Sequence, residues 1–261
     1  MPRRPPGSGA MSVWLRPGPK PRQPAPAFSR DEITRVAIEL ADRGGLEAVS
    51  MRRIASRIGS APTSLYWYFS DKDELYELMV DAVIGQVPLL ERPSGDWRAD
   101  LAAIAWAARA TLSSHPWFAQ VGIHPVAGPQ TLRFGATTLR SFEGLALDQE
   151  TEVNILAAIN NYIYGFVQRE VAWQRFAPRA EPAAAPAHEG EISAEHLAAR
   201  TKLHGDESFA FGLECLLDGF AVRVARAEAN GELARGGVLL ARAGPRDRGR
   251  TPDRVDSRSR S

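Results

Sequence analysis

Apolar residues recur along this chain at the spacing of one helical face, and polar residues fill the positions between them. The first such run begins at Ser29, which has the spacing of a capping box with Glu32, and it ends at the glycine pair 44–45. A second run, over residues 50–58, opens with a serine, a residue type that accepts hydrogen bonds from the free amides at a helix start. These patterns predict two helices.

Gly59 follows the second helix, and glycine adopts the left-handed backbone of a sharp turn at little steric cost. In the next segment, Pro62–Phe69, a leucine and a phenylalanine four residues apart face the core, and hydroxyl and aromatic side chains lie on the other faces. This is the layout of a helix-turn-helix whose second helix lies in a DNA major groove. Ser70 is then expected to cap a fourth helix over residues 70–87.

The rest of the chain also has helical periodicity, and we see no convincing strand and no internal repeat. We therefore predict an all-α fold. The later segments are predicted as helices at 96–113, 131–145, 149–176 and 206–226, irregular backbone at 115–129, a loop at 178–186 and a short helix within 188–203.

Charge is distributed unevenly along the chain, although its 261 residues carry a net charge of only +1. Every charged side chain up to Arg30 is basic, which suits either a DNA phosphate backbone or a solubilising leader; Met11 could equally be the initiator. The predicted parts are a flexible basic arm (1–28), a helix-turn-helix DNA-binding domain (29–88), a larger helical segment (94–228) and a disordered tail (229–261).

The two longest predicted helices have the features of interface helices. The helix over 149–176 is apolar on two sides, and such a helix is usually buried on two sides. The helix over 206–226 carries Gly212, Cys215 and Gly219 in a row, and small residues in a row let another helix approach closely.

Several classes of protein are excluded by the composition. Cys215 is the only cysteine, which excludes intramolecular disulfides and a cysteine-clustered zinc site. No uninterrupted apolar run is long enough to span a bilayer, and the Pro-rich N-terminus lacks the apolar segment of a signal peptide. We expect a cytoplasmic protein with no membrane partner and no cofactor.

The run from Ser29 to about Val87 resembles the DNA-binding domain of the TetR family of transcriptional repressors. The late segment ESFAFGLECLLDGF and the tryptophan in LYWYF resemble the branch that contains the tetracycline repressor. The residues that carry the main resemblance are Ile33, Val36, Ala37 and Leu40 in the first helix, the segment 45–52, Ile54 and Ala55, the segment 65–69, Lys72 and Leu75.

The resemblance implies a ligand-responsive repressor. It implies an all-α homodimer. Each subunit would have an N-terminal three-helix helix-turn-helix domain (29–88) and a larger C-terminal helical domain (94–228) for effector binding and dimerisation. Two long helices of each subunit, here 149–176 and 206–226, would form a four-helix interface. A two-fold dimer presents two recognition helices to double-stranded DNA, so its operator is an approximate palindrome. A small molecule bound in the larger domain would then release the DNA.

We predict DNA contacts from the helix-turn-helix and the start of the fourth helix. Hydroxyls near the start of the recognition helix read base edges permissively, or else only cap that helix. Tyrosines in this setting position the protein on phosphates, and a lysine at a helix N-terminus binds a phosphate or pairs with a neighbouring aspartate. The predicted DNA-contacting residues are Ser50, Arg52, Pro62, Thr63, Ser64, Tyr66, Trp67, Tyr68 and Lys72.

Polar residues within apolar helices are the candidates for effector contact, because an apolar pocket with a few oriented polar groups is how small ligands are held. Taken singly, each aromatic residue among them could instead be a core residue, and the arginine could face solvent. The predicted effector residues are Trp106, Arg109, His115, Trp117, Phe134, Phe142, Asn160, Asn161, Tyr164 and Gln168.

The alternatives concern a metal and other functions. His115 and His124 invite a metal hypothesis, because tetracyclines bind such repressors as magnesium chelates, but the pair has no recognised ligand spacing and we expect no metal. A helical enzyme would need His115, Tyr164 or Asn160 for acid–base work, and no catalytic arrangement supports one. An architectural DNA-binding protein and an activator of the same fold stay open.

Overall fold

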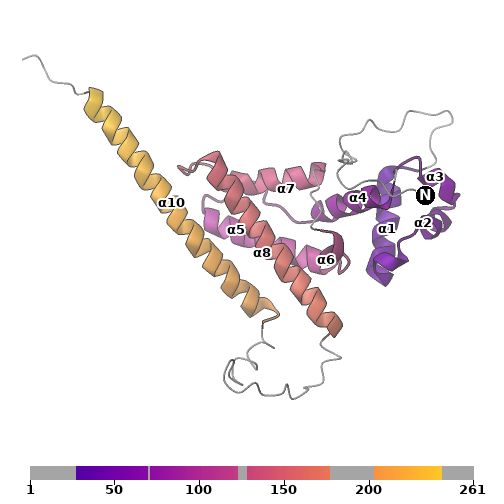
Figure 1. The fold of residues 1–261 in the computed structure, drawn as a ribbon. Helices are drawn as coiled ribbons and strands as arrows, with labels where there is room; N and C mark the ends of the chain where they lie inside the picture. Colours follow the sequence, from indigo (N-terminus) through magenta and orange to yellow (C-terminus); the bar gives the residue numbers. More distant parts are fainter. Residues whose placement is uncertain (1–27, 70, 123–127, 177–202, 243–261) are drawn as a thin grey trace, which may run out of the picture.

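The computed structural model describes residues 28–69, 71–122, 128–176 and 203–242, and within these ranges it is all-α, with no strand. Figure 1 shows α1, α2 and α3 gathered at one end of the molecule and α10 along the opposite side. Predicted segments at 1–27, 178–186, 188–202 and 243–261, together with Ser70 and His124, lie outside the described residues.

The first helices form as their sequence predicts. Helix α1 (Arg30–Gly44) begins with the expected capping box: Ser29 Oγ accepts from the Glu32 amide at 3.1 Å, and the Ser29 amide donates to Glu32 Oε2 at 2.8 Å. After the 3-10 helix η2 (Leu46–Ala48), α2 (Met51–Ile58) ends at Gly59, whose φ of 68° and ψ of 34° are left-handed. The glycine therefore makes the turn that the sequence predicts.

The next two helices differ from the sequence prediction. Helix α3 (Pro62–Leu65) is a single turn, and the chain continues to Phe69 through tight turns rather than as a longer helix. Helix α4 (Lys72–Ile84) begins after Asp71, whose carboxylate accepts from the Glu74 amide at 2.9 Å. Asp71 is thus the N-cap that we expected Ser70 to be, because a carboxylate caps as well as a hydroxyl and suits the positive end of the helix dipole.

The larger half of the molecule is built around α8 (Gln149–Phe176), whose bounds match the prediction. Against it pack α5 (Trp97–Ser113), the short α6 (Phe118–Val121), α7 (Pro129–Arg140) and α10 (Asp206–Arg242). Helix α10 continues well past the predicted end at 226, into the segment predicted to be disordered, because 227–242 is rich in the helix formers Ala, Leu, Arg and Glu.

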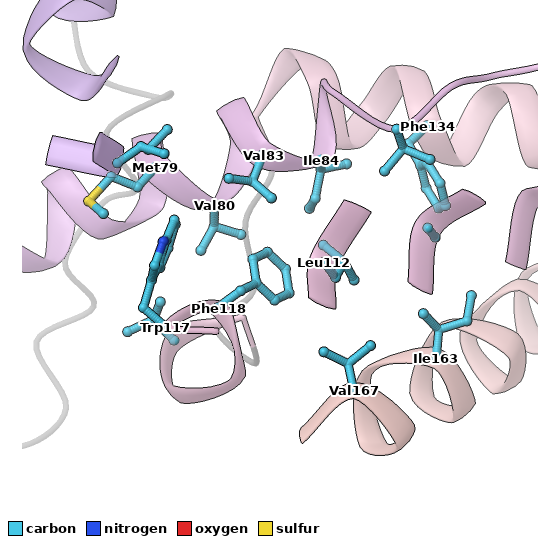
Figure 2. Packing of buried hydrophobic residues seen from close by; sticks show 14 of the residues in the cluster. Met79, Val80, Val83, Ile84, Leu112, Trp117, Phe118, Phe134, Ile163 and Val167 are labelled. Carbon is cyan, nitrogen blue, oxygen red and sulfur yellow. The ribbon is translucent and has the colours of Figure 1, made fainter. Parts of the chain in front are cut away.

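One continuous apolar core joins the two halves, and α4 lies within it. Figure 2 shows Val80 and Val83 of α4 close to Trp117 and Phe118, with Leu112 between α4 and α8. The helix that follows the DNA-binding element is therefore shared with the larger domain.

Candidate nucleic-acid interface and effector region

Two buried side chains anchor α3, the predicted recognition helix, to the core. Leu65 and Phe69 are almost fully buried, whereas Pro62, Thr63 and Ser64 are exposed on α3. Proline occupies the first helical position after Ala61, where its missing N–H leaves no hydrogen bond unmade. The geometry therefore presents a small, hydroxyl-bearing surface outward.

Three of the predicted DNA-contacting residues lie around one small groove. Ser50, Tyr66 and Lys72 line a hollow of about 260 Å³ together with Val49, Met51 and Leu75. Ser50 caps α2, with its Oγ accepting from the Arg53 amide at 3.3 Å, and Lys72 is the first residue of α4. Two helix N-termini, an ammonium and a phenol are thus brought together, which is a combination suited to binding an anion.

The aromatic residues after α3 divide between solvent and core. Tyr66 and Trp67 are 57% and 62% exposed. Tyr68 is buried instead, and its hydroxyl donates to the Phe28 carbonyl at 2.6 Å. This differs from the phosphate contact we expected of Tyr68, because the turn after α3 directs its ring into the core.

The exposed face of α2 carries more arginines than the one that we predicted to contact DNA. Arg52 is exposed there, as expected, and Arg53 and Arg57 are exposed on the same short helix. The i, i+4 spacing of Arg53 and Arg57 was a signal for this face, because residues four apart lie above one another on a helix.

The predicted effector residues fall into several groups rather than one. Arg109 is buried, and it donates to Glu170 of α8 at 2.5 and 3.1 Å and to Asp206 of α10 at 2.9 Å. Its guanidinium also lies 5.2 Å from the Trp106 ring and 4.8 Å from the Phe209 ring. Desolvation works to lower the pKa of Arg109, but its bonds to both carboxylates raise it above the ordinary value. Arg109 therefore joins three helices as an ion pair.

His115 and Trp117 lie instead at the junction of the two halves. Both face Asp42 of α1, whose Oδ1 is 2.7 Å from His115 Nδ1 and accepts from Trp117 Nε1 at 2.7 Å. The other ring nitrogen of His115 is 3.3 Å from Gln86 Oε1 beyond the end of α4. Asp42 and Gln86 were not singled out from the sequence, since nothing local marks them.

A second polar connection fastens α4 to α7. Asp81 is buried, and its carboxylate accepts from the amides of Gln130 and Thr131 and from the Thr131 hydroxyl, at 2.8 to 3.3 Å. The carboxylate therefore lies against the N-terminus of α7, where the helix dipole favours negative charge. A Cβ at Gly128 would overlap this carboxylate, so the close approach requires glycine there.

Tyr164 and Gln168 lie where α8 meets α6. Tyr164 is half-buried, its ring centroid is 5.8 Å from that of Phe118, and burial raises the pKa of its phenol. Gln168 Nε2 donates to the Ala119 carbonyl at 3.0 Å. Of the other candidates on α7, α8 and the turn after α7, Phe134 (near Ile84 in Figure 2) and Phe142 are buried, Asn160 is half-buried and Asn161 is exposed.

The outer faces of α8 and α10 expose apolar side chains. Val153, Phe211 and Val222 are 55%, 72% and 50% exposed. A groove of about 590 Å³ runs between the two helices. Its lining consists of Thr151, Asn154, Ile155, Cys215, Leu216, Gly219, Phe220 and Arg223.

The predicted row of small residues on α10 is divided between two faces. Cys215 and Gly219 are exposed, but Gly212 lies against Tyr162, whose hydroxyl oxygen is 2.5 Å from where a Cβ would stand. Gly212 therefore allows α8 and α10 of one chain to approach, and the outward part of the row is shorter than predicted.

Neither a metal-binding cluster nor a membrane-spanning helix is present in the part of the chain that the structure describes. No cluster of three or more His, Cys, Asp or Glu side chains there could hold a metal ion. None of the described helices combines the length and apolar character needed to cross a membrane.

Two family descriptions match adjoining parts of the chain. Residues 33–79 match "Bacterial regulatory proteins, tetR family", and residues 88–224 match "Tetracyclin repressor-like, C-terminal domain". An HTH-type transcriptional regulator of Saccharopolyspora erythraea is 35% identical over 164 residues, which cover 62% of this chain and 69% of that protein. The HTH-type transcriptional repressor DrrR1 of Streptomyces coeruleorubidus is 32% identical over 227 residues, with 78% and 82% covered.

The fold is also similar to a solved one. Apo ActR of Streptomyces coelicolor superposes with a TM-score of 0.66 at 24% identity, covering 78% of this chain and 99% of ActR. The same protein has been solved in complex with actinorhodin. At this identity the likeness concerns the fold.

Proposed function

Because this chain belongs to the TetR family of bacterial regulatory proteins, we propose that it is a ligand-responsive transcriptional repressor that binds an approximately palindromic operator as a homodimer. The observation that carries the DNA-binding part is the groove shared by Ser50, Tyr66 and Lys72. We assign this groove to a backbone phosphate of double-stranded DNA, with the bases read by the adjacent α3.

The phosphate contacts fix position and the α3 contacts give specificity. Lys72 supplies a charge at the N-terminus of α4, and the Tyr66 hydroxyl and the amides that follow Ser50 supply donors. Arg52 and Trp67 are also exposed, and we assign both to the sugar–phosphate backbone. Pro62, Thr63 and Ser64 meet base edges, where hydroxyls both donate and accept and the apolar parts pack on thymine methyl groups.

The homodimer is assigned to the outer faces of α8 and α10, over 149–176 and 206–226. Exposed Val153, Phe211 and Val222 form the apolar part of this surface. A single-chain surface that exposes large apolar side chains in this way is typical of a protein interface. Sedimentation of the full chain at micromolar concentration tests the assignment, and a monomer at that concentration would contradict it.

The effector is a small molecule that acts from the larger domain. The ActR complex with actinorhodin supports such a role for a protein of this fold. We assign effector contact to side chains of α5, α6 and α8 that face the interior of the larger domain, including Trp106, Tyr164 and Gln168. Arg109, His115 and Trp117 already bind protein carboxylates, so in our proposal they transmit the effector's presence rather than receive it.

Release of DNA requires that the effector bind the DNA-incompetent state more tightly, and about 1–3 kcal/mol of coupling is the usual scale. The connections from Asp42 to His115 and from Asp81 to the start of α7 are the polar contacts through which the two halves would change together. Candidate compounds should lower the affinity for the operator, and the operator should lower theirs by the same factor.

Fluorescence anisotropy with the DNA upstream of the chain's own gene tests the proposal as a whole. A specific repressor keeps its affinity in excess random duplex, whereas an architectural protein loses it. Transcription in vitro from the same DNA separates a repressor from an activator. Turnover of a screened compound would instead favour the enzyme alternative.

A further inference from the structure

A groove of about 730 Å³ runs along α1 on the side that faces α4 and the start of α7. Its floor is apolar, with Ile38 of α1 and Leu78 and Ala82 of α4. Its sides are acidic, because Asp31, Glu39, Asp42 and Asp81 line it against the cation of Arg35 and the ring of His115. The groove thus combines an apolar strip with an excess of negative charge, and it covers the junction between the two halves.

Several of these carboxylates already have partners within the chain. Glu39 pairs with Arg35 at 2.9 Å, Asp42 faces His115 and Trp117, and Asp81 binds the start of α7. Asp31 lies exposed in the first turn of α1, at one end of the groove. The single arginine does not balance the four carboxylates, so a cationic occupant is electrostatically favoured.

The chain enters the fold beside this end of the groove. Phe28 packs against the core and is held by the Tyr68 hydroxyl, and Asp31 follows three residues later. The residues before Phe28 therefore begin next to the acidic mouth. Up to residue 27 they contain only basic charges, at Arg3, Arg4, Arg16, Lys20 and Arg22.

The length and composition of the nearest part of this arm match the groove. Residues 20–27 read KPRQPAPA, and a Pro-rich segment of eight residues spans about 25 Å at about 3.1 Å per residue. From Asp31 to Asp42 the axis of α1 extends about 16 Å, at 1.5 Å per residue. The segment is therefore long enough to run the full length of α1.

We propose that this groove is the docking surface for the chain's own segment 20–27. The prolines lie on the strip formed by Ile38, Leu78 and Ala82, and Lys20 and Arg22 lie along the acidic side formed by Glu39 and Asp42. In this position the arm spans the junction between the DNA-binding and larger domains, and its cations are withheld from other anions.

The test is disulfide formation between an engineered cysteine in the arm and one in the groove of the full chain. In a Cys215→Ser background, Gln23→Cys is combined with Ala82→Cys, which alters no charge. The control combines Gln23→Cys with Ser56→Cys, an exposed position on α2 outside the groove. Gln130→Cys, on the α7 side of the groove, is a second position that serves if Ala82→Cys impairs folding.

The expected result is that the intramolecular disulfide forms at least about fivefold faster at position 82 or 130 than at position 56, because docking raises the local concentration of the arm. Adding Asp31→Asn and Glu39→Gln should reduce this advantage, as should 1 M salt, at which the screening length is about 3 Å. Equal rates at groove and control positions would overturn the proposal. Cross-links formed mainly between chains would also overturn it and assign the groove to a second copy. Neither result depends on operator binding.

Discussion

Asp42 of α1 accepts a 2.7 Å hydrogen bond from the indole Nε1 of Trp117, which is 75 residues later in the chain. His115 lies at the same distance from the same carboxylate oxygen. One side chain of the DNA-binding half thus holds two buried polar groups of the larger domain.

Asp42→Ala should lower the free energy of unfolding by about 1–3 kcal/mol, because the Trp117 N–H and a His115 nitrogen lose their acceptor while they stay buried. Urea denaturation followed by circular dichroism measures this loss. Arg43→Ala, at the exposed neighbouring position, is the control and should stay within about 0.5 kcal/mol of the parent. Equal denaturation midpoints for the Asp42 variant and the parent would show that this junction contributes nothing to stability.

Lys72→Ala should weaken binding to every duplex and reduce the salt slope of the logarithm of the binding constant by about one, because one phosphate contact is lost. Lys72→Arg retains the charge and should keep the slope. Both are measured by anisotropy titrations at several salt concentrations. A slope that does not change on removal of the lysine would take Lys72 out of the phosphate contacts.

Thr63→Val should instead relax the base preference at a single position of each half-site, because valine keeps the shape of threonine but cannot hydrogen-bond to a base edge. Binding to a set of operators substituted one base pair at a time should reveal a change of about 1–3 kcal/mol in discrimination at that position. The salt slope should be that of the parent chain. A uniform loss over all operators would mean that Thr63 only caps α3.

Gly212→Ala should destabilise the subunit by about 1–3 kcal/mol, because the new Cβ would overlap the Tyr162 ring. The ring has little room to move, since its hydroxyl donates to the Phe209 carbonyl at 2.7 Å and it stacks on the Phe209 ring. Gly219→Ala is the matched control on the same helix: its Cβ would meet nothing within 4 Å of the chain.

The two glycine variants together also test the dimer. Gly219→Ala should leave subunit stability unchanged or raise it slightly, since alanine favours a helix. If the face that carries Gly219 pairs with a second copy, the same change should weaken dimerisation in sedimentation experiments. A variant with the dimer affinity of the parent would place the interface elsewhere.

The helices were predictable because their signals are local. The capping box at Ser29, the left-handed Gly59 and the bounds of α8 each follow from residues a few positions apart. The all-α class was predicted correctly for the same reason, and the resemblance to the TetR family rests on one such continuous stretch.

The polar connections were not predictable, because their partners are distant in sequence. Arg109 was a candidate effector contact, but its partners Glu170 and Asp206 lie 61 and 97 residues later. Tyr68 was assigned to the outer surface with Tyr66, yet one turn of backbone placed it in the core. Periodicity gives the face of a residue only as far as the helix is correctly bounded, and α3 is shorter than its sequence pattern. The proposed DNA and effector contacts stay predictions.

Because α3 is short, each DNA-binding domain can contact only a few base pairs. A single helical turn places no more than a few side chains against base edges, so few base pairs of an operator can be recognised by direct contact. Discrimination among similar operators then depends on the stiffness of the duplex. The two DNA-binding domains of a dimer have a fixed spacing, and the free energy of bending the DNA to fit it depends on bases that the protein never contacts. This protein should therefore bind with different affinities to operators that share the contacted bases but differ in the flexible base-pair steps between them.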